Sequence, residues 1–154
     1  MSNKIAITAD RVVRHTSEGS NDRIRRRTEA QIAYAAQQGP EYIEQRLQEL
    51  DREWDVERCL ETGAASISLV GMALGATVNR KWFLLPATVA GFLLQHALQG
   101  WCPPLPVLRR LGVRTADEIN RERYALKVLR GDFAEVASTD ATRSVTEVIS
   151  ATRH

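Results

Sequence analysis

The sequence has little cysteine and little histidine. Of its 154 residues two are cysteines, Cys59 and Cys102, and three are histidines, His15, His96 and His154, which are scattered along the chain. There is no Cys-x-x-C pair. The sequence therefore predicts neither a disulfide framework nor a zinc site, and we expect no metal and no cofactor.

An excess of charge of one sign is also missing. The 21 Lys and Arg residues nearly balance the 19 Asp and Glu residues, for a formal net charge of +2. Nucleic-acid binding depends on a strongly basic surface, so we expect no nucleic-acid partner. No hydrolytic constellation is recognisable either, and the sequence predicts no enzyme.

Charge is absent altogether from two long stretches of the chain. Residues 62–78 and 82–101 contain no Asp, Glu, Lys or Arg, whereas charged residues are dense before and after them. In a soluble helical bundle, charged residues recur on every helix. The first stretch covers roughly 26 Å as a helix, close to the roughly 30 Å of a bilayer core. The pattern predicts an all-α protein with a two-helix antiparallel transmembrane hairpin; a soluble core hairpin is the competing interpretation.

The two spans are expected at about 59–78 and 82–101. Gly71 and Gly75 have the Gly-x-x-x-Gly spacing that lets helix backbones approach closely, so we expect them at a helix contact. Tryptophans open and close the second span, where interfacial aromatic residues belong. The basic tripeptide 79–81 forms the predicted turn.

Basic residues near the span ends set the expected orientation. Six lie on the side of the two termini and two in the turn, which predicts both termini in the cytoplasm. No signal-peptide pattern precedes the first span, so we expect that span to direct insertion. The basic residues are Arg46, Arg52 and Arg58 before the first span, Arg109, Arg110 and Arg114 after the second, and Arg80 and Lys81 in the turn.

Four segments follow from this reading: a polar helical N-terminal arm, the transmembrane hairpin, a cytoplasmic amphipathic helix and a polar tail. In the arm, Gly39 and Pro40 separate a helix capped near residues 21–22 from one that begins near Glu41. The N-terminal arm is residues 1–56, the hairpin 57–103, the amphipathic helix 104–133 and the polar tail 134–154.

An apolar seam runs along the second helix of the arm. Ile43, Leu47, Leu50 and Trp54 are spaced four, three and four residues apart, the spacing of a coiled-coil stripe. Two interpretations remain open. The seam packs against another part of the chain or the membrane surface, or it binds a protein partner.

The segment after the hairpin contains strong helix signals. Thr115 and Glu118 fit a capping box, and Gly131 fits the residue after a helix end, which predicts a helix over 116–130. Its basic residues and its apolar side predict binding to anionic membrane lipids. The apolar side consists of Ile119, Leu126 and Leu129.

A polar cluster is expected at the open end of the hairpin. If the chain turns near residue 80, residues equally far from the turn lie at the same depth. An ionisable group inside a span is costly and often functional. The cluster predicts either a thiol site, with His96 favouring the thiolate, or a Glu61 ion pair beside two inert cysteines. Its members are Cys59, Glu61, His96, Gln99 and Cys102.

Several features between residues 57 and 133 carry a family resemblance. They are Glu57-Arg58 before a glycine-rich span, a tryptophan that opens the second span, the exit Gly100-Trp101-Cys102-Pro103, then Leu111-Gly112 and Thr115. This pattern resembles a family of small bacterial inner-membrane proteins of unknown function that also supplies the membrane anchor of YgaP-type rhodaneses. The resemblance implies a two-span hairpin in the bacterial inner membrane and self-association. It does not imply sulfur transfer, because residues 1–56 contain no cysteine and predict no rhodanese domain.

The function predicted from these features is that of a membrane-anchored scaffold or accessory subunit. Its cytoplasmic helical arms would bind a protein partner or a second copy of the chain. The alternative is a thiol-based redox or sulfur-relay protein that uses Cys59 and Cys102. A soluble helical binding protein is the third possibility.

Overall fold

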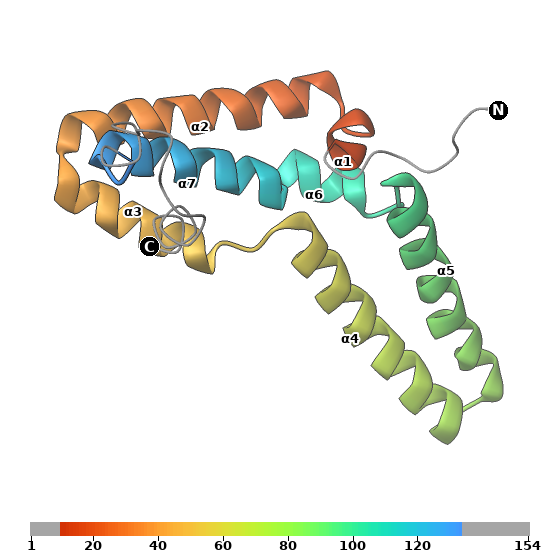
Figure 1. The fold of residues 1–154 in the computed structure, drawn as a ribbon. Helices are drawn as coiled ribbons and strands as arrows, with labels where there is room; N and C mark the ends of the chain where they lie inside the picture. Colours follow the sequence, from red (N-terminus) through yellow and green to blue (C-terminus); the bar gives the residue numbers. More distant parts are fainter. Residues whose placement is uncertain (1–9, 134–154) are drawn as a thin grey trace, which may run out of the picture. The chain divides into compact units, whose positions relative to one another are not determined.

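The computed structural model describes residues 10–133, and every regular element among them is helical (Figure 1). The all-α prediction is confirmed for this part of the chain. The predicted polar tail, 134–154, lies outside the described residues. The elements are α1 (Arg11–Arg14), α2 (Glu18–Gln38), α3 (Pro40–Arg52), α4 (Val56–Thr77), the 3-10 helix η1 (Arg80–Phe83), α5 (Leu84–Gln99), α6 (Leu105–Leu111) and α7 (Ala116–Arg130).

The described residues form two compact units. The α4–α5 unit contains the residues up to Arg26 together with Trp54–Glu118, and the α3–α7 unit contains Arg27–Glu53 together with the residues from Ile119. The expected N-terminal arm therefore contributes to both units, as does the segment after the hairpin. Sequence reasoning treated these segments as separate because it cannot pair helices that lie far apart along the chain.

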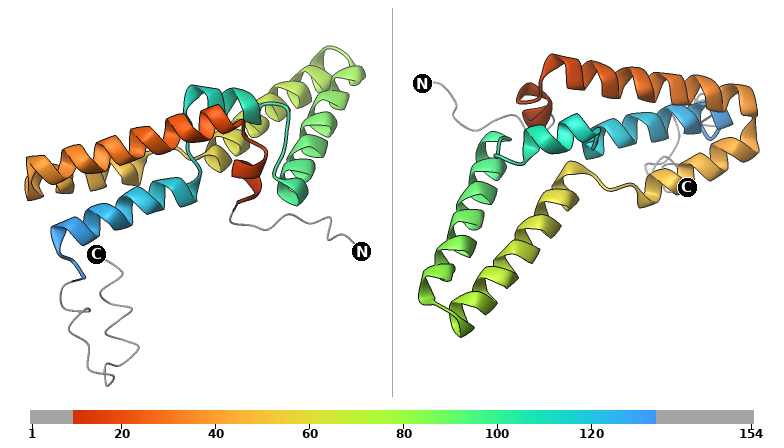
Figure 2. Two further views of the ribbon diagram at one scale, coloured as in Figure 1. Left: turned by 90° about the horizontal axis from the view of Figure 1, so that it is seen from above. Right: turned by 180° about the vertical axis from the view of Figure 1, so that it is seen from behind.

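The turn between α4 and α5 is made by η1. The side chain of Asn79 accepts a hydrogen bond of 2.9 Å from the backbone N–H of Lys81 and so caps η1. From this turn α4 and α5 run in opposite directions, and they draw apart toward their other ends (Figures 1 and 2). At its far end α5 stops at Gly100, whose φ of 76° is a left-handed conformation that favours glycine.

A small apolar core closes the open end of the α4–α5 unit. It joins one residue of α1, two of α4, one of α6 and a cysteine from the segment between α5 and α6. The backbone N–H of Val56 also donates to the carbonyl of Arg114 over 3.0 Å. The core residues are Val12, Val56, Leu60, Cys102 and Leu105.

Arg109 is the most buried charged side chain of the same unit, with 1% of its surface exposed. Its guanidinium donates to both carboxylate oxygens of Glu118, at 2.6 and 2.7 Å. It also donates to Asn21 at 3.0 Å, to Thr16 at 3.1 Å and to the carbonyl of Val113 at 3.0 Å. One side chain of α6 thus ties the start of α2 to the start of α7.

The start of α2 differs from the expected cap at residues 21–22. The helix begins at Glu18, because the carbonyl of Ser17 already accepts from the backbone N–H groups of Ser20 and Asn21. The side chain of Asn21 is used in tertiary contacts. Its amide donates to the carbonyl of Val13 over 2.9 Å, and its oxygen accepts from Arg109. By contrast, the capping box of α7 is confirmed: the backbone N–H of Thr115 donates to Glu118 over 2.8 Å.

The α3–α7 unit uses the predicted seam as its core. Ile43, Leu47 and Leu50 are buried against other helices of the same unit, so the interpretation of same-chain packing holds for them. Trp54, the fourth seam residue, is half-exposed in the α4–α5 unit, where the Arg58 guanidinium lies 4.5 Å from its ring centre. The core consists of Ala35, Ile43, Leu47, Leu50, Ile119 and Leu126.

This core corrects the expectation that the helix over 116–130 lies on a lipid surface. Ile119 and Leu126 are buried inside the protein and only Leu129 is exposed. Two basic residues of α7 are also paired within the unit: Arg123 donates to Asp51 over 2.8 Å, and Arg130 contacts Glu44. The apolar side of α7 is therefore not free to enter a membrane.

Candidate functional site

The outer surface of α4 and α5 is apolar. The uncharged stretches of the sequence map onto these two helices, and many of their large hydrophobic side chains are exposed. In a protein surrounded by water, an apolar patch of this extent marks a site of contact with another protein or with lipid. The exposed side chains of α4, of α5 and of the turn between them are Ile67, Leu69, Val70, Met72, Val78, Trp82, Phe83, Leu84, Phe92, Leu94 and Leu98.

One helical stretch within residues 10–133 is long and apolar enough to cross a membrane. It is an 18-residue window within Pro40–Thr77, of which 22% is buried. A core helix of a soluble protein would be mostly buried. The helix α5 is shorter, at 16 residues, and η1 precedes it directly.

Gly71 and Gly75 lie where α4 approaches the start of α5. A Cβ atom on Gly71 would lie 2.8 Å from Cδ of Pro86, and one on Gly75 would lie 2.9 Å from the ring of Phe83. These separations are shorter than van der Waals contact. The small residues thus permit a close approach inside the chain itself, between the two helices of one hairpin.

The polar side chains near the open end are arranged differently from the expected cluster. His96 is buried, and its Nε2 atom lies 4.0 Å from Oε1 of Glu57. Arg11 donates to the same Glu57 oxygen over 3.3 Å, and to the carbonyl of Ala97 over 3.3 Å. The polar site that the structure shows is therefore Arg11, Glu57 and His96.

Glu61 and Gln99 are exposed and Cys59 is half-buried, so these expected members do not join His96. If residues equally far from residue 80 lay at the same depth (the equal-depth rule), His96 would face Ala64. Its partner is instead Glu57, about two helical turns farther from the turn. The rule fails because α4 and α5 separate as they leave the turn, and longer side chains then bridge the gap. The sequence does offer a signal for Glu57, which is a second carboxylate one helical turn before Glu61. No sequence pattern near Arg11 indicates that it joins this site.

The two cysteines have different surroundings, and both are free thiols. Cys102 is 2% exposed and packs in the apolar core with Val56, Leu60 and Leu105. Its burial raises the pKa of the thiol, and a hydrogen bond from the backbone N–H of Leu105 offsets only part of this effect. A protonated, enclosed thiol is a poor nucleophile.

No group of three or more His, Cys, Asp and Glu side chains that could hold a metal ion exists among residues 10–133. The polar site contains one carboxylate and one imidazole beside a guanidinium, whose positive charge repels a cation. The 4.0 Å between Nε2 of His96 and Oε1 of Glu57 is longer than a hydrogen bond, so the contact between these two side chains is electrostatic.

Comparison of the chain with protein-family models, with curated proteins and with solved structures found no match.

Proposed function

We propose that this protein is a membrane-anchored scaffold or accessory subunit. In this proposal α4 and α5 cross a bacterial inner membrane as a two-span hairpin with both termini on the cytoplasmic side. The helices outside the membrane bind a protein partner. The proposal is based mainly on the exposed apolar surface of the uncharged residues 62–78 and 82–99.

Three further features support a membrane hairpin. The helical residues 80–99, which comprise η1 and α5, have the length of a span when taken together. Trp82 and Trp101 lie at the two ends of the second uncharged stretch, where a bilayer interface would hold them. The resemblance to small inner-membrane proteins, carried by Gly100-Trp101-Cys102-Pro103 and the residues around it, points in the same direction.

The surface proposed for the partner is the exposed side of α7. Ile43, Leu47 and Leu50 of the seam are covered within the chain, so these three side chains are not open to a partner. On α7, Tyr124 is 54% exposed and Val128, one turn later, is 62% exposed. Side chains four residues apart lie on one side of a helix, so these two form a short apolar strip next to Leu129.

The thiol-relay alternative has no observation in its favour. Cys102 is enclosed by aliphatic side chains, whereas Cys59 lies outside that core. A scaffold needs no reactive group, and it fits the burial of Cys102 better.

The membrane proposal predicts a defined topology. In a Cys59→Ser, Cys102→Ala background, a cysteine at position 79 should react with an impermeant maleimide from outside intact inner-membrane spheroplasts. A cysteine at exposed position 41 should react only after lysis, and the protein should stay with membranes in carbonate. Release by carbonate would contradict the membrane proposal, and labelling of position 41 before lysis would contradict the orientation.

The partner proposal predicts a position-specific crosslink. A photoreactive amino acid in place of Val128 should give one discrete adduct in cells, whereas the same group in place of exposed Glu41 should give none. Tyr124→Glu should abolish the Val128 adduct without releasing the protein from membranes. An adduct of twice the chain's mass would identify a second copy as the partner. Equal crosslinking from both positions would show that α7 holds no specific contact.

A further inference from the structure

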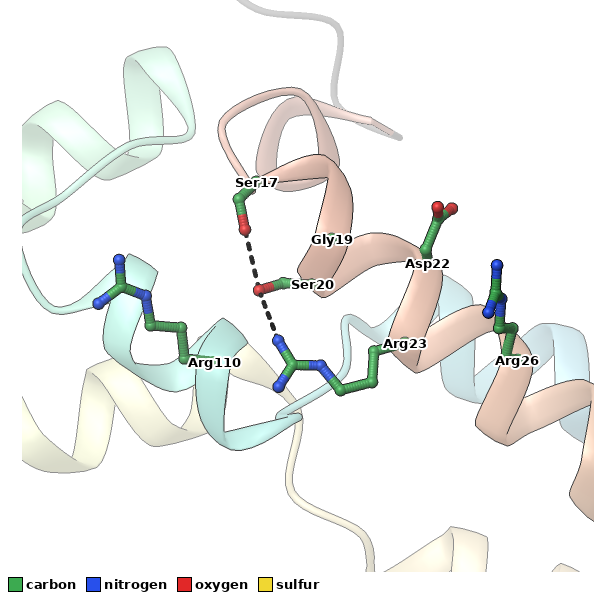
Figure 3. Close-up of a pocket in the computed structure, with 7 residues that line it drawn as sticks. All are labelled: Ser17, Gly19, Ser20, Asp22, Arg23, Arg26 and Arg110. Carbon is green, nitrogen blue, oxygen red and sulfur yellow. Dashed lines mark hydrogen bonds between the residues drawn. The ribbon is translucent and has the colours of Figure 1, made fainter.

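A basic hollow lies beside the open end of the α4–α5 unit, apart from the polar site of Arg11, Glu57 and His96. It has a volume of about 640 Å³, ample for a phosphate group with an attached glycerol. Figure 3 shows that its lining residues come from α2, from the residue just before it and from α6. The lining residues are Ser17, Gly19, Ser20, Asp22, Arg23, Arg26 and Arg110.

Three arginines line this hollow, and among the described residues none of them forms an ion pair with a carboxylate. Arg23 donates to the hydroxyl of Ser20, over 3.5 Å. The one acidic residue of the lining, Asp22, is paired with Arg25 at 2.9 Å, and Arg25 is not part of the lining. Within residues 10–133, the charge of the hollow is therefore positive.

Hydroxyl groups lie between the arginines. The hydroxyl of Ser17 donates to that of Ser20 over 2.9 Å, and Arg23 and Arg110 flank this pair from α2 and α6 (Figure 3). The pair sits at the first turn of α2, a helix of 21 residues, whose N-terminal end adds a partial positive charge. Guanidinium groups with hydroxyl groups and a helix N-terminus form a setting suited to phosphate oxygens.

The position of the hollow indicates which kind of molecule would supply the phosphate. The helix α6 begins at Leu105, only four residues after Trp101, the expected interfacial tryptophan. Arg11 of α1, just before α2, bonds to the carbonyl of Ala97 near the end of α5. Within this unit the hollow therefore lies at the end of α5 that would meet the membrane surface.

We propose that Arg110 and Arg23, the latter positioned by its hydrogen bond to the buried hydroxyl of Ser20, bind the phosphate of an anionic phospholipid headgroup in the cytoplasmic leaflet. The proposal rests on the membrane hairpin of the proposed function. Anionic headgroups attract basic residues near the membrane surface. A specific binding site would in addition hold one lipid in place and fix the depth of the α4–α5 unit in the membrane.

The test measures lipid binding by the full chain in detergent. Native mass spectrometry would compare phosphatidylglycerol with phosphatidylcholine, and thermal unfolding would be followed with inorganic phosphate alone. Wild-type protein should retain phosphatidylglycerol preferentially. The double variant Arg23→Gln, Arg110→Gln should bind it about 30-fold more weakly, and Arg23→Lys, Arg110→Lys should recover part of the loss.

The matched control is Arg27→Gln, Arg121→Gln, which removes two exposed arginines outside the hollow and has the same net charge as the test variant. Equal losses in both pairs would overturn the site, because they would show a general effect of charge. Protection by inorganic phosphate without any preference between lipids would overturn the lipid assignment. Carbonate extraction separates the two proposals: a protein that stays in the membrane but shows no lipid preference contradicts only this inference.

Discussion

Arg109→Met is expected to lower the free energy of unfolding by about 3–5 kcal/mol. The side chain is almost wholly buried and makes five hydrogen bonds to the residues around it. Its loss would leave the carboxylate of Glu118 and the side chain of Asn21 without their charged partner. Removing one member of a buried ion pair is costly because the remaining charge is desolvated and uncompensated.

The matched control is Arg110→Met on the same helix. Its side chain is exposed, so in lipid-free detergent its effect should stay within about 0.5 kcal/mol. Denaturant unfolding followed by circular dichroism would compare the two variants. Equal stability of Arg109→Met and the wild type would show that the network of Arg109 contributes nothing to the fold.

The same network predicts a dependence of stability on pH. Burial opposes ionisation of Glu118, but hydrogen bonds from Arg109 and from the backbone N–H of Thr115 outweigh it, and the pKa lies below its usual value of 4.5. The carboxylate is thus more acidic in the folded chain than in the unfolded one. Its contribution is fully present above pH 4.5 and is lost as the pH falls through the folded pKa. Glu118→Gln should remove this part of the acid dependence.

Gly75→Leu is expected to force α4 and α5 apart beside the turn, with a loss of about 1–3 kcal/mol or more. Even a Cβ atom at this position would lie 2.9 Å from the ring of Phe83, and η1 holds that ring against α4. Gly71→Leu should act in the same way through Pro86, where the separation is 2.8 Å. Thermal unfolding in detergent would give the loss of stability.

Gly63→Leu supplies the control, since it lies in the same helix and a Cβ there meets nothing within 4 Å. Spin labels at exposed positions 67 and 92 would report the separation of the two helices. A longer distance in Gly75→Leu, but not in Gly63→Leu, is the expected result. Unchanged distances in both would mean that the hairpin does not depend on the close approach at Gly75.

Local features of the structure could be read from the sequence. The capping box of Thr115 and Glu118 set the start of α7, and Gly131, with a φ of 90°, follows its end. The segregation of charge placed the apolar surface on the residues of α4 and α5, and the spacing of Gly71 and Gly75 marked a close helix contact. Each of these signals depends on neighbours within a few residues, so the chain specifies them without reference to its fold.

The tertiary structure alone decided which segments meet. From its sequence alone, the seam of Ile43, Leu47 and Leu50 could equally be a partner-binding site or part of a core. In the structure, residues of α2 and α7 pack against it. The polar site depends on Arg11, which lies 46 residues before Glu57, and the equal-depth rule could not anticipate the separation of α4 from α5. Long-range pairing is selected by the packing of whole helices, and no pattern within one helix records which partner it will meet.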